Sequence, residues 1–96
     1  MIANYSSKVS RNGVNFHQFV KSAKENKKFR FVLDGRTYVA DEYMVDEAIL
    51  WRIFRNENDI VPTNIFLSFD ELLEEGVFEG LSFGERYEDM DILNFD

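Results

Sequence analysis

The most informative segment of the chain is residues 29–40, which read FRFVLDGRTYVA. Two runs rich in aromatic and β-branched residues flank Asp34-Gly35. An Asp-Gly pair between such runs predicts a two-residue hairpin turn, because a type I′ turn needs positive φ at both positions. The turn sets the register of the predicted strand pairs, which are Leu33–Arg36, Val32–Thr37, Phe31–Tyr38 and Arg30–Val39.

The predicted register also assigns the two faces of this hairpin, because residues opposite each other share a face. One face carries Phe29, Phe31, Leu33, Tyr38 and Ala40. The other face carries Arg30, Val32, Thr37 and Val39 and is half apolar. We therefore expect both faces to be partly covered.

A helix is predicted before the hairpin. Asn15 is a favourable N-cap, and Gln18 follows it at the spacing of a capping box. The apolar residues then recur at i, i+3, i+4 and i+7, and they are Phe16, Phe19, Val20 and Ala23. The helix is expected to end near Asn26, with lysines in its last turn.

A second helix is predicted after the hairpin, from Asp41 or Glu42 to about Arg55. Acids at its start and arginines at its end match the helix dipole. Its apolar residues lie on nearly every side, as in a central helix or a helix facing a partner. We expect a central helix.

The remainder of the chain contains shorter predicted elements. Residues 56–63 are the best loop candidate, and residues 64–69 are compatible with a strand. Ser68 and Glu71 have the spacing of a capping box that opens a short helix through Glu75, ended by Gly76. The fold class is therefore α+β: a small single domain with the hairpin 29–40 packed on two helices, plus an acidic C-terminal segment. We expect residues 1–69 to form the core and residues 70–96 to dock on the same domain.

Length and composition exclude several classes of protein. The chain has 96 residues, enough for one hydrophobic core and too few for two. It has no cysteine and one histidine, which excludes disulfides, thiolate metal sites and cysteine nucleophiles. No run approaches the roughly 18 apolar residues of a membrane span, and residues 1–13 lack the apolar region of a secretory signal. We therefore expect a cytoplasmic protein without a membrane partner.

The formal net charge of −7 hides an uneven distribution. Residues 1–36 hold eight Lys and Arg against two acids, whereas residues 37–96 hold three Arg against sixteen acids. Residues 70–96 alone carry ten acids and one Arg. The halves of such a chain attract each other within one fold, or the acidic part serves a basic partner. Direct binding of nucleic acid is not expected, because phosphate is repelled by a net acidic protein.

No set of residues indicates catalysis, a metal or a cofactor. His17 has no second histidine and no acid within helical reach, and no serine lies in a Gly-x-Ser-x-Gly turn. Adjacent acids such as Glu88-Asp89-Met90-Asp91 lack the calcium-loop pattern. Gly76, Gly80 and Gly84 are surrounded by acids and are followed by no lysine, unlike a phosphate loop. A small enzyme that uses His17 or a carboxylate pair remains a rival hypothesis.

The acidic surface is then the best candidate site for a partner. The proposed contacts are Asp70, Glu71, Glu74, Glu75, Glu79, Glu85, Glu88, Asp89, Asp91, Phe78 and Phe83. If helical, residues 70–96 carry one net charge per about 4.5 Å, against one per about 1.7 Å of a DNA duplex. Imitation of DNA therefore requires further acids from a neighbouring element or a second subunit.

In size, charge and lack of cysteine the chain resembles the small inhibitor proteins that bacteriophages and mobile elements encode, some of which imitate DNA. The resemblance covers no motif. We hypothesise a non-enzymatic binding protein that occupies a basic surface of a partner, such as a nucleic-acid-handling enzyme. The alternative is a homo-oligomeric structural protein, as small as a homodimer, assembled through basic N-terminal and acidic C-terminal surfaces.

Overall fold

The computed structural model describes residues 5, 7–56 and 58–95, and the hairpin predicted from Asp34-Gly35 is its centre. Strands β1 (Lys28–Leu33) and β2 (Arg36–Val45) pair antiparallel in the predicted register. Asp34 and Gly35 take φ values of 52° and 76°, so both turn positions lie in the left-handed region. This part of the prediction is confirmed in every pair.

The second predicted helix is wrong, because residues 41–55 continue the sheet. Strand β2 runs on to Val45, the chain turns at Asp46-Glu47, and β3 (Ala48–Phe54) returns antiparallel to β2. Apolar residues on all sides of a helix and apolar residues on both faces of a strand give similar sequences. The expected hairpin on two helices is therefore a three-stranded meander, and the broader assignment to the α+β class is confirmed.

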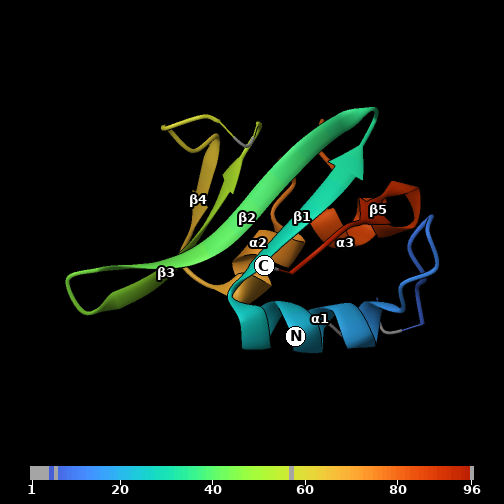
Figure 1. Ribbon diagram of the computed structural model, residues 1–96, viewed down its shortest axis with the longest axis horizontal. Helices are drawn as coiled ribbons and strands as arrows, with labels where there is room; N and C mark the ends of the chain where they lie inside the picture. Colours follow the sequence, from blue (N-terminus) through green and yellow to red (C-terminus); the bar gives the residue numbers. More distant parts are fainter. Residues whose placement is uncertain (1–4, 6, 57, 96) are drawn as a thin grey trace.

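Two short strands complete an antiparallel sheet with the order β4-β3-β2-β1-β5 (Figure 1). Strand β4 (Asn64–Phe66) follows the predicted loop and pairs with β3, but it is shorter than the expected strand 64–69, because Ser68 caps a helix that begins at Phe69. Strand β5 (Asp91–Ile92) pairs with β1. A segment close to the C-terminus therefore completes the sheet directly beside the central hairpin.

The helices supply the second layer. Helix α1 (Phe16–Asn26) begins after Asn15, whose side chain accepts the N–H groups of His17 and Gln18, as predicted. Helix α2 (Phe69–Glu74) is capped by Ser68, also as predicted. Helix α3 (Phe83–Arg86) has a capping box between Ser82 and Glu85 and continues into the 3-10 helix η2 (Tyr87–Asp89).

The core between sheet and helices is aromatic. The ring of Phe19 on α1 lies 4.9 Å from that of Phe29 on β1 and 5.3 Å from that of Phe83 on α3, measured between centroids. Trp51 of β3 packs on Phe69 of α2 at 4.8 Å. Aromatic pairs at these separations add to the free energy of burial.

The other face of the sheet is also partly covered, as the half-apolar pattern of the hairpin predicts. Val39 and Phe54 are buried there. The guanidinium of Arg52 lies over the rings of Tyr43 and Phe54 and is bonded to Asp41, which covers apolar surface with a paired charge.

Residues 70–95 pack into the same core as the residues before them. They supply Leu72, Leu73, Phe78, Phe83, Tyr87, Met90 and Ile92 to the buried cluster. Close to the N-terminus, the Asn12 side chain exchanges hydrogen bonds of 2.6 and 2.9 Å with the backbone of Ile92. The radius of gyration is 12.4 Å, as expected for one domain of this length.

Candidate functional site

Four outward carboxylates on and beside α2 form the clearest candidate surface, which we call the α2 acidic face. They are Asp70, Glu71, Glu74 and Glu75. Phe69, Leu72 and Leu73 bury the inner side of the helix, and so the acids in between are directed outward. With Ser68 they line a shallow hollow of about 480 Å³.

Most of these charges are not compensated within the protein. The carboxylates of Asp70, Glu71 and Glu75 have no ion pair or hydrogen bond to any residue that the structure describes, and neither has that of Glu79. Asp70 and Glu71 lie in the first turn of α2, where carboxylates suit the helix dipole. Glu74 and Glu75 lie at the other end, where the dipole disfavours them.

Glu79 does not extend a row of helical carboxylates. A continuous helix would align Glu71, Glu75 and Glu79 at intervals of four, but α2 ends at Glu74. Glu79 lies in the following turn with a φ of 56°. The backbones of Gly76 and Gly80 approach each other so closely that a Cβ on Gly76 would lie 2.8 Å from the Gly80 carbonyl oxygen.

The acids nearer the C-terminus are engaged within the fold. Glu85 accepts the Ser82 N–H at 2.9 Å, and this bond, the Ser82 hydroxyl and the charge of Lys8 lower the pKa of Glu85. The Arg11 guanidinium bonds to both Asp91 oxygens, at 3.0 and 2.8 Å, and holds the pKa of that carboxyl below its usual range. Two weaker pairs, Glu88–Lys8 at 3.8 Å and Asp89–Arg86 at 3.2 Å, complete this group.

Phe78 and Phe83, expected beside the acids as partner contacts, lie in the core. Phe78 is 8% exposed and Phe83 is 0% exposed. The Phe83 ring lies 5.0 Å from that of Phe31, between centroids. Both rings therefore stabilise the fold, and a partner reaches neither without opening it. In the sequence, an aromatic residue among acids has the same pattern whether it docks inward or outward.

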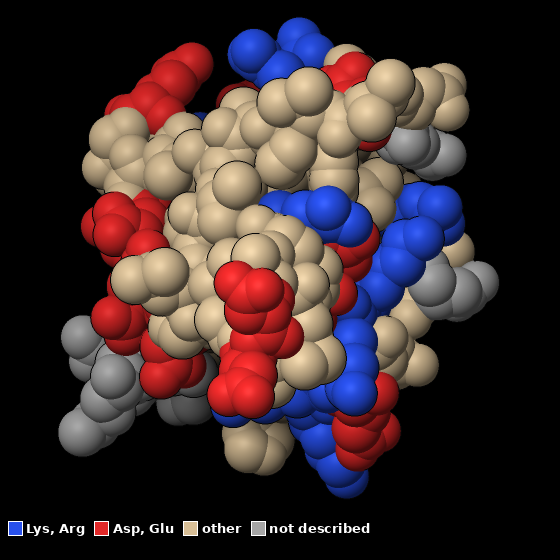
Figure 2. All heavy atoms as spheres, turned by 90° about the vertical axis from the view of Figure 1, so that its left-hand side faces the viewer, with Lys and Arg blue, Asp and Glu red and all other residues tan. Residues whose placement is uncertain are grey.

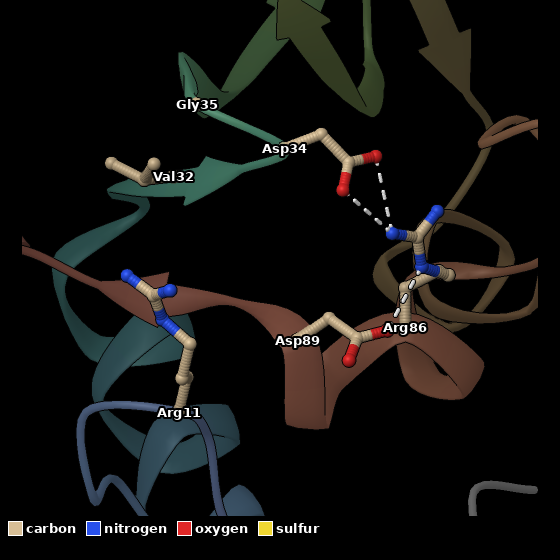
Figure 3. Close-up of a pocket in the computed structure, with 6 residues that line it drawn as sticks. All are labelled: Arg11, Val32, Asp34, Gly35, Arg86 and Asp89. Atoms are coloured by element: carbon tan, nitrogen blue, oxygen red, sulfur yellow. Dashed lines mark hydrogen bonds and ion pairs between the residues drawn. The ribbon is translucent and has the colours of Figure 1, made fainter.

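A polar pocket of about 480 Å³ lies beside the hairpin turn and is lined by Arg11, Val32, Asp34, Gly35, Arg86 and Asp89 (Figure 3). The Arg86 guanidinium donates to both Asp34 oxygens at 3.1 Å and to Asp89 at 3.2 Å. Arg11, the other cation of the pocket, is bonded to Asp91. Because each guanidinium already has a carboxylate, we assign this network to holding the turn against α3.

His17 is exposed in the first turn of α1. Its backbone N–H bonds to the Asn15 side chain at 3.0 Å. No hydrogen bond or ion pair joins its imidazole to another described residue, and no group of three or more His, Asp or Glu side chains in the described ranges is arranged to hold a metal ion.

The uneven charge of the sequence becomes a separation in space. Lys21, Lys24 and Lys27 of the α1 region are exposed, and the ammonium of Lys24 lies 5.9 Å from the centroid of the Phe69 ring. Figure 2 shows the end of the molecule from which β2 and β3 project: acidic side chains gather at the lower centre and on the left margin, and basic side chains on the right, below and at the top, with some acids among them. The two kinds of charge are thus exposed side by side at one end.

Sequence reasoning missed the exposed apolar residues of this end. Met44 is 66% exposed and Ile49 is 53% exposed, and they are paired across β2 and β3. The signal in the sequence was the spread of apolar residues around all sides of the predicted helix. That spread predicted a partner or a central position, but it could not reveal a strand pair extending beyond its neighbours.

Comparison with protein-family models, with curated proteins and with solved structures finds no match to this chain. Within the described residues, none of the helices has the length and apolar character needed to cross a membrane. The function must therefore be argued from the surfaces described above.

Proposed function

We propose that this is a non-enzymatic binding protein that uses the α2 acidic face to occupy a basic surface of a partner protein. The single observation that carries the proposal is that the carboxylates of Asp70, Glu71 and Glu75 have no ion pair or hydrogen bond to a described residue. Nearer the C-terminus, by contrast, four acids are paired internally: Glu85, Glu88, Asp89 and Asp91. A basic surface that binds nucleic acid is the partner we favour, because such surfaces are built to hold a row of anions.

The density of charge on α2 supports this choice of partner. Six helical residues span about 9 Å. The three carboxylates within the helix, Asp70, Glu71 and Glu74, therefore give one charge per about 3 Å, against one per about 1.7 Å of duplex axis. The likeness is local, and a larger footprint would need acids from elsewhere on the surface.

The position of Glu74 and Glu75 also supports a binding role. Carboxylates near the C-terminus of a helix face the negative end of its dipole and its unpaired carbonyl groups. Stability does not favour acids at this place. Departures from local stability rules are concentrated at functional sites.

The test compares capture of host proteins by the wild type and by the triple variant Glu71→Gln, Glu74→Gln, Glu75→Gln. We expect the variant to bind the captured protein at least about tenfold more weakly, with a free energy of unfolding within about 1 kcal/mol of wild type. A duplex oligonucleotide should displace the wild type, and higher salt should weaken binding.

The matched control is Glu25→Gln, Asp59→Asn, Glu88→Gln, which changes the net charge equally at exposed positions away from α2. It should bind as the wild type does. Equal loss in both variants would show that only net charge matters, and unchanged affinity in the α2 variant would contradict the acidic face as the binding surface.

A further inference from the structure

The pair of strands β2 and β3 extends beyond the rest of the sheet. The last residue of β2 that pairs with β1 is Asp41, and the first residue of β3 that pairs with β4 is Trp51. Residues 42–50 therefore form a two-stranded projection, which we call the arm (Figure 1). Isolated two-stranded ribbons are marginally stable in water, so an arm of this kind gains stability from a second surface.

Both edges of the arm present unpaired backbone groups. The N–H of Glu42 donates to the Lys27 carbonyl, so alternate residues of β2 face the β1 side, and Met44 is the next of them. By the same alternation, the bond from Thr63 N–H to the Ile53 carbonyl places the backbone of Ile49 on the β4 side. No described strand lies beside either residue.

The side chains of these two residues form an exposed apolar pair. Met44 lies opposite Ile49, and Ile49 shares its face with the buried Trp51, two residues along β3. The apolar surface of the core thus continues outward from Trp51 to Ile49 and Met44, with Glu42 on the same face opposite Trp51. Val45 is a further exposed apolar residue near the tip, at 46%.

The arm carries acids and no basic residue: Glu42, Asp46 and Glu47. Asp46 and Glu47 form the tip, and neither has an ion pair with a described residue. The tip lies about 14 Å from Glu42 at the base, at about 3.4 Å per residue. Its carboxylates are therefore too far from the base to pair with cations located there.

Two exposed lysines, Lys24 and Lys27, lie at the base of the arm, beside Glu42. The Lys27 backbone bonds to Glu42, and the Lys24 ammonium lies over Phe69, which packs on Trp51. This end of the molecule therefore carries two acids at the tip of the arm, the apolar Met44–Ile49 pair in the middle, and the two lysines with Glu42 at the base. A surface arranged in this way is complementary to a copy of itself turned by 180°.

We propose that the arm is a dimerisation element in which two copies cross their arms face to face. The Met44–Ile49 pairs of the two copies pack together. Asp46 and Glu47 of each copy lie against Lys24 and Lys27 of the other.

The first test is the oligomeric state of the whole chain, measured by light scattering and sedimentation from about 1 μM to about 1 mM. We expect a concentration-dependent dimer. The variant Met44→Thr, Ile49→Thr keeps β-forming residues at exposed positions and should raise the dimer dissociation constant at least about tenfold. The control Ile60→Thr, Val61→Thr alters two apolar residues of the 56–63 loop that are more exposed than Met44 and Ile49, and it should dimerise as the wild type does.

The second test exchanges the charges. Asp46→Lys, Glu47→Lys opposes like charges in its homodimer, and Lys24→Glu, Lys27→Glu does the same with the opposite sign. Each variant alone should dimerise weakly, but an equimolar mixture should form a heterodimer of near wild-type affinity, because both contacts are then complementary. Circular dichroism and the unfolding midpoint establish that each variant is folded.

Three results would overturn the proposal: a wild type that stays monomeric to about 1 mM, a Met44→Thr, Ile49→Thr variant that dimerises as tightly as the wild type, and a charge-exchanged mixture that stays monomeric. A monomeric wild type whose capture of another protein is lost with the Met44 and Ile49 changes would assign the arm to that protein instead. The α2 variant with three glutamines should remain dimeric, so the failure of one proposal leaves the other standing.

Discussion

Three residues with positive φ shape the central sheet. Asp34 and Gly35 form the first turn, with φ values of 52° and 76°, and Asp46 opens the second turn at 56°. The first turn carries the Asp-Gly signature and is predictable. The second contains Asp46-Glu47, without glycine, and only Asp46 takes a positive φ. A turn without its usual residue type gives no signal in the sequence, so the strands on either side of it were assigned to one helix.

Gly35 tests the contribution of the first turn. A Cβ at this position meets no atom within 4 Å, so a substitution acts through the backbone conformation alone. Gly35→Val should lower the free energy of unfolding by about 1 kcal/mol or more, because β-branched residues avoid positive φ. Gly35→Asn should lose less, since asparagine tolerates this region. Urea unfolding measures the stability of both variants. If Gly35→Val were as stable as the wild type, the positive φ at position 35 would not be required for stability.

Glu85 tests the capping box of α3 through pH. Its bonds to Ser82 lower its pKa from the ordinary value of 4.5. Because the folded pKa is depressed, the stabilisation is present above about pH 4.5 and is lost as the pH falls through the folded pKa. Glu85→Gln should therefore be less stable than wild type at pH 7 and nearly equal to it when both side chains are neutral. A gap in unfolding free energy that stays constant from pH 7 to about pH 2 would contradict this assignment.

At the scale of elements, prediction succeeded where local chemistry decides the structure. Helix α1 has its cap at Asn15 and ends at Asn26, and α2 begins after Ser68, because side-chain caps satisfy the first N–H groups of a helix locally. The helix predicted for residues 41–55 is wrong for a different reason. The conformation of this segment depends on its pairing with β1 and β4. The pattern of apolar residues within the segment does not indicate this pairing.

At helix α2 we predict a substitution that raises the free energy of unfolding, whereas most substitutions lower it. Glu75 is its C-cap, and no basic residue lies in its last turn. Glu75→Gln should raise the free energy of unfolding by a few tenths of a kcal/mol, because a negative charge is removed from the negative end of the helix. Asp70→Asn, at the other end, should lower it by a similar amount. Thermal unfolding at low salt measures both changes, and the same sign in both variants would exclude a dipole effect.

At the scale of the whole molecule, the candidate site divides into a predictable and an unpredictable part. Exposed acids are expected on this segment, and Asp70, Glu74 and Glu75 are exposed, whereas Glu71 is half-buried. Which acids are compensated depends on contacts between distant residues, such as Arg11 with Asp91 and Arg86 with Asp34. The order of charges along the sequence does not indicate these pairs. Nor does the sequence indicate that Phe78 and Phe83 point into the core.

Phe83 tests how far the fold depends on residues 70–95. Its ring is fully buried between Phe19 and Phe31. Phe83→Ala should lower the free energy of unfolding by about 3–5 kcal/mol, a large part of the roughly 5–15 kcal/mol of a typical domain. The control Leu93→Ala removes a side chain that is 48% exposed and should change it by less than about 1 kcal/mol. A small effect at Phe83 would show that this segment packs loosely.

The pairing of β5 with β1, together with the bonds between Asn12 and Ile92, has a consequence for synthesis of the protein. A ribosome exposes the chain from its N-terminus, so the aromatic side chains of the central hairpin emerge well before the residues that cover them. Until residues 83–92 leave the exit tunnel, the apolar face of the central hairpin is exposed in the nascent chain. The hairpin is therefore covered only after residues 83–92 have emerged, which delays the completion of the core.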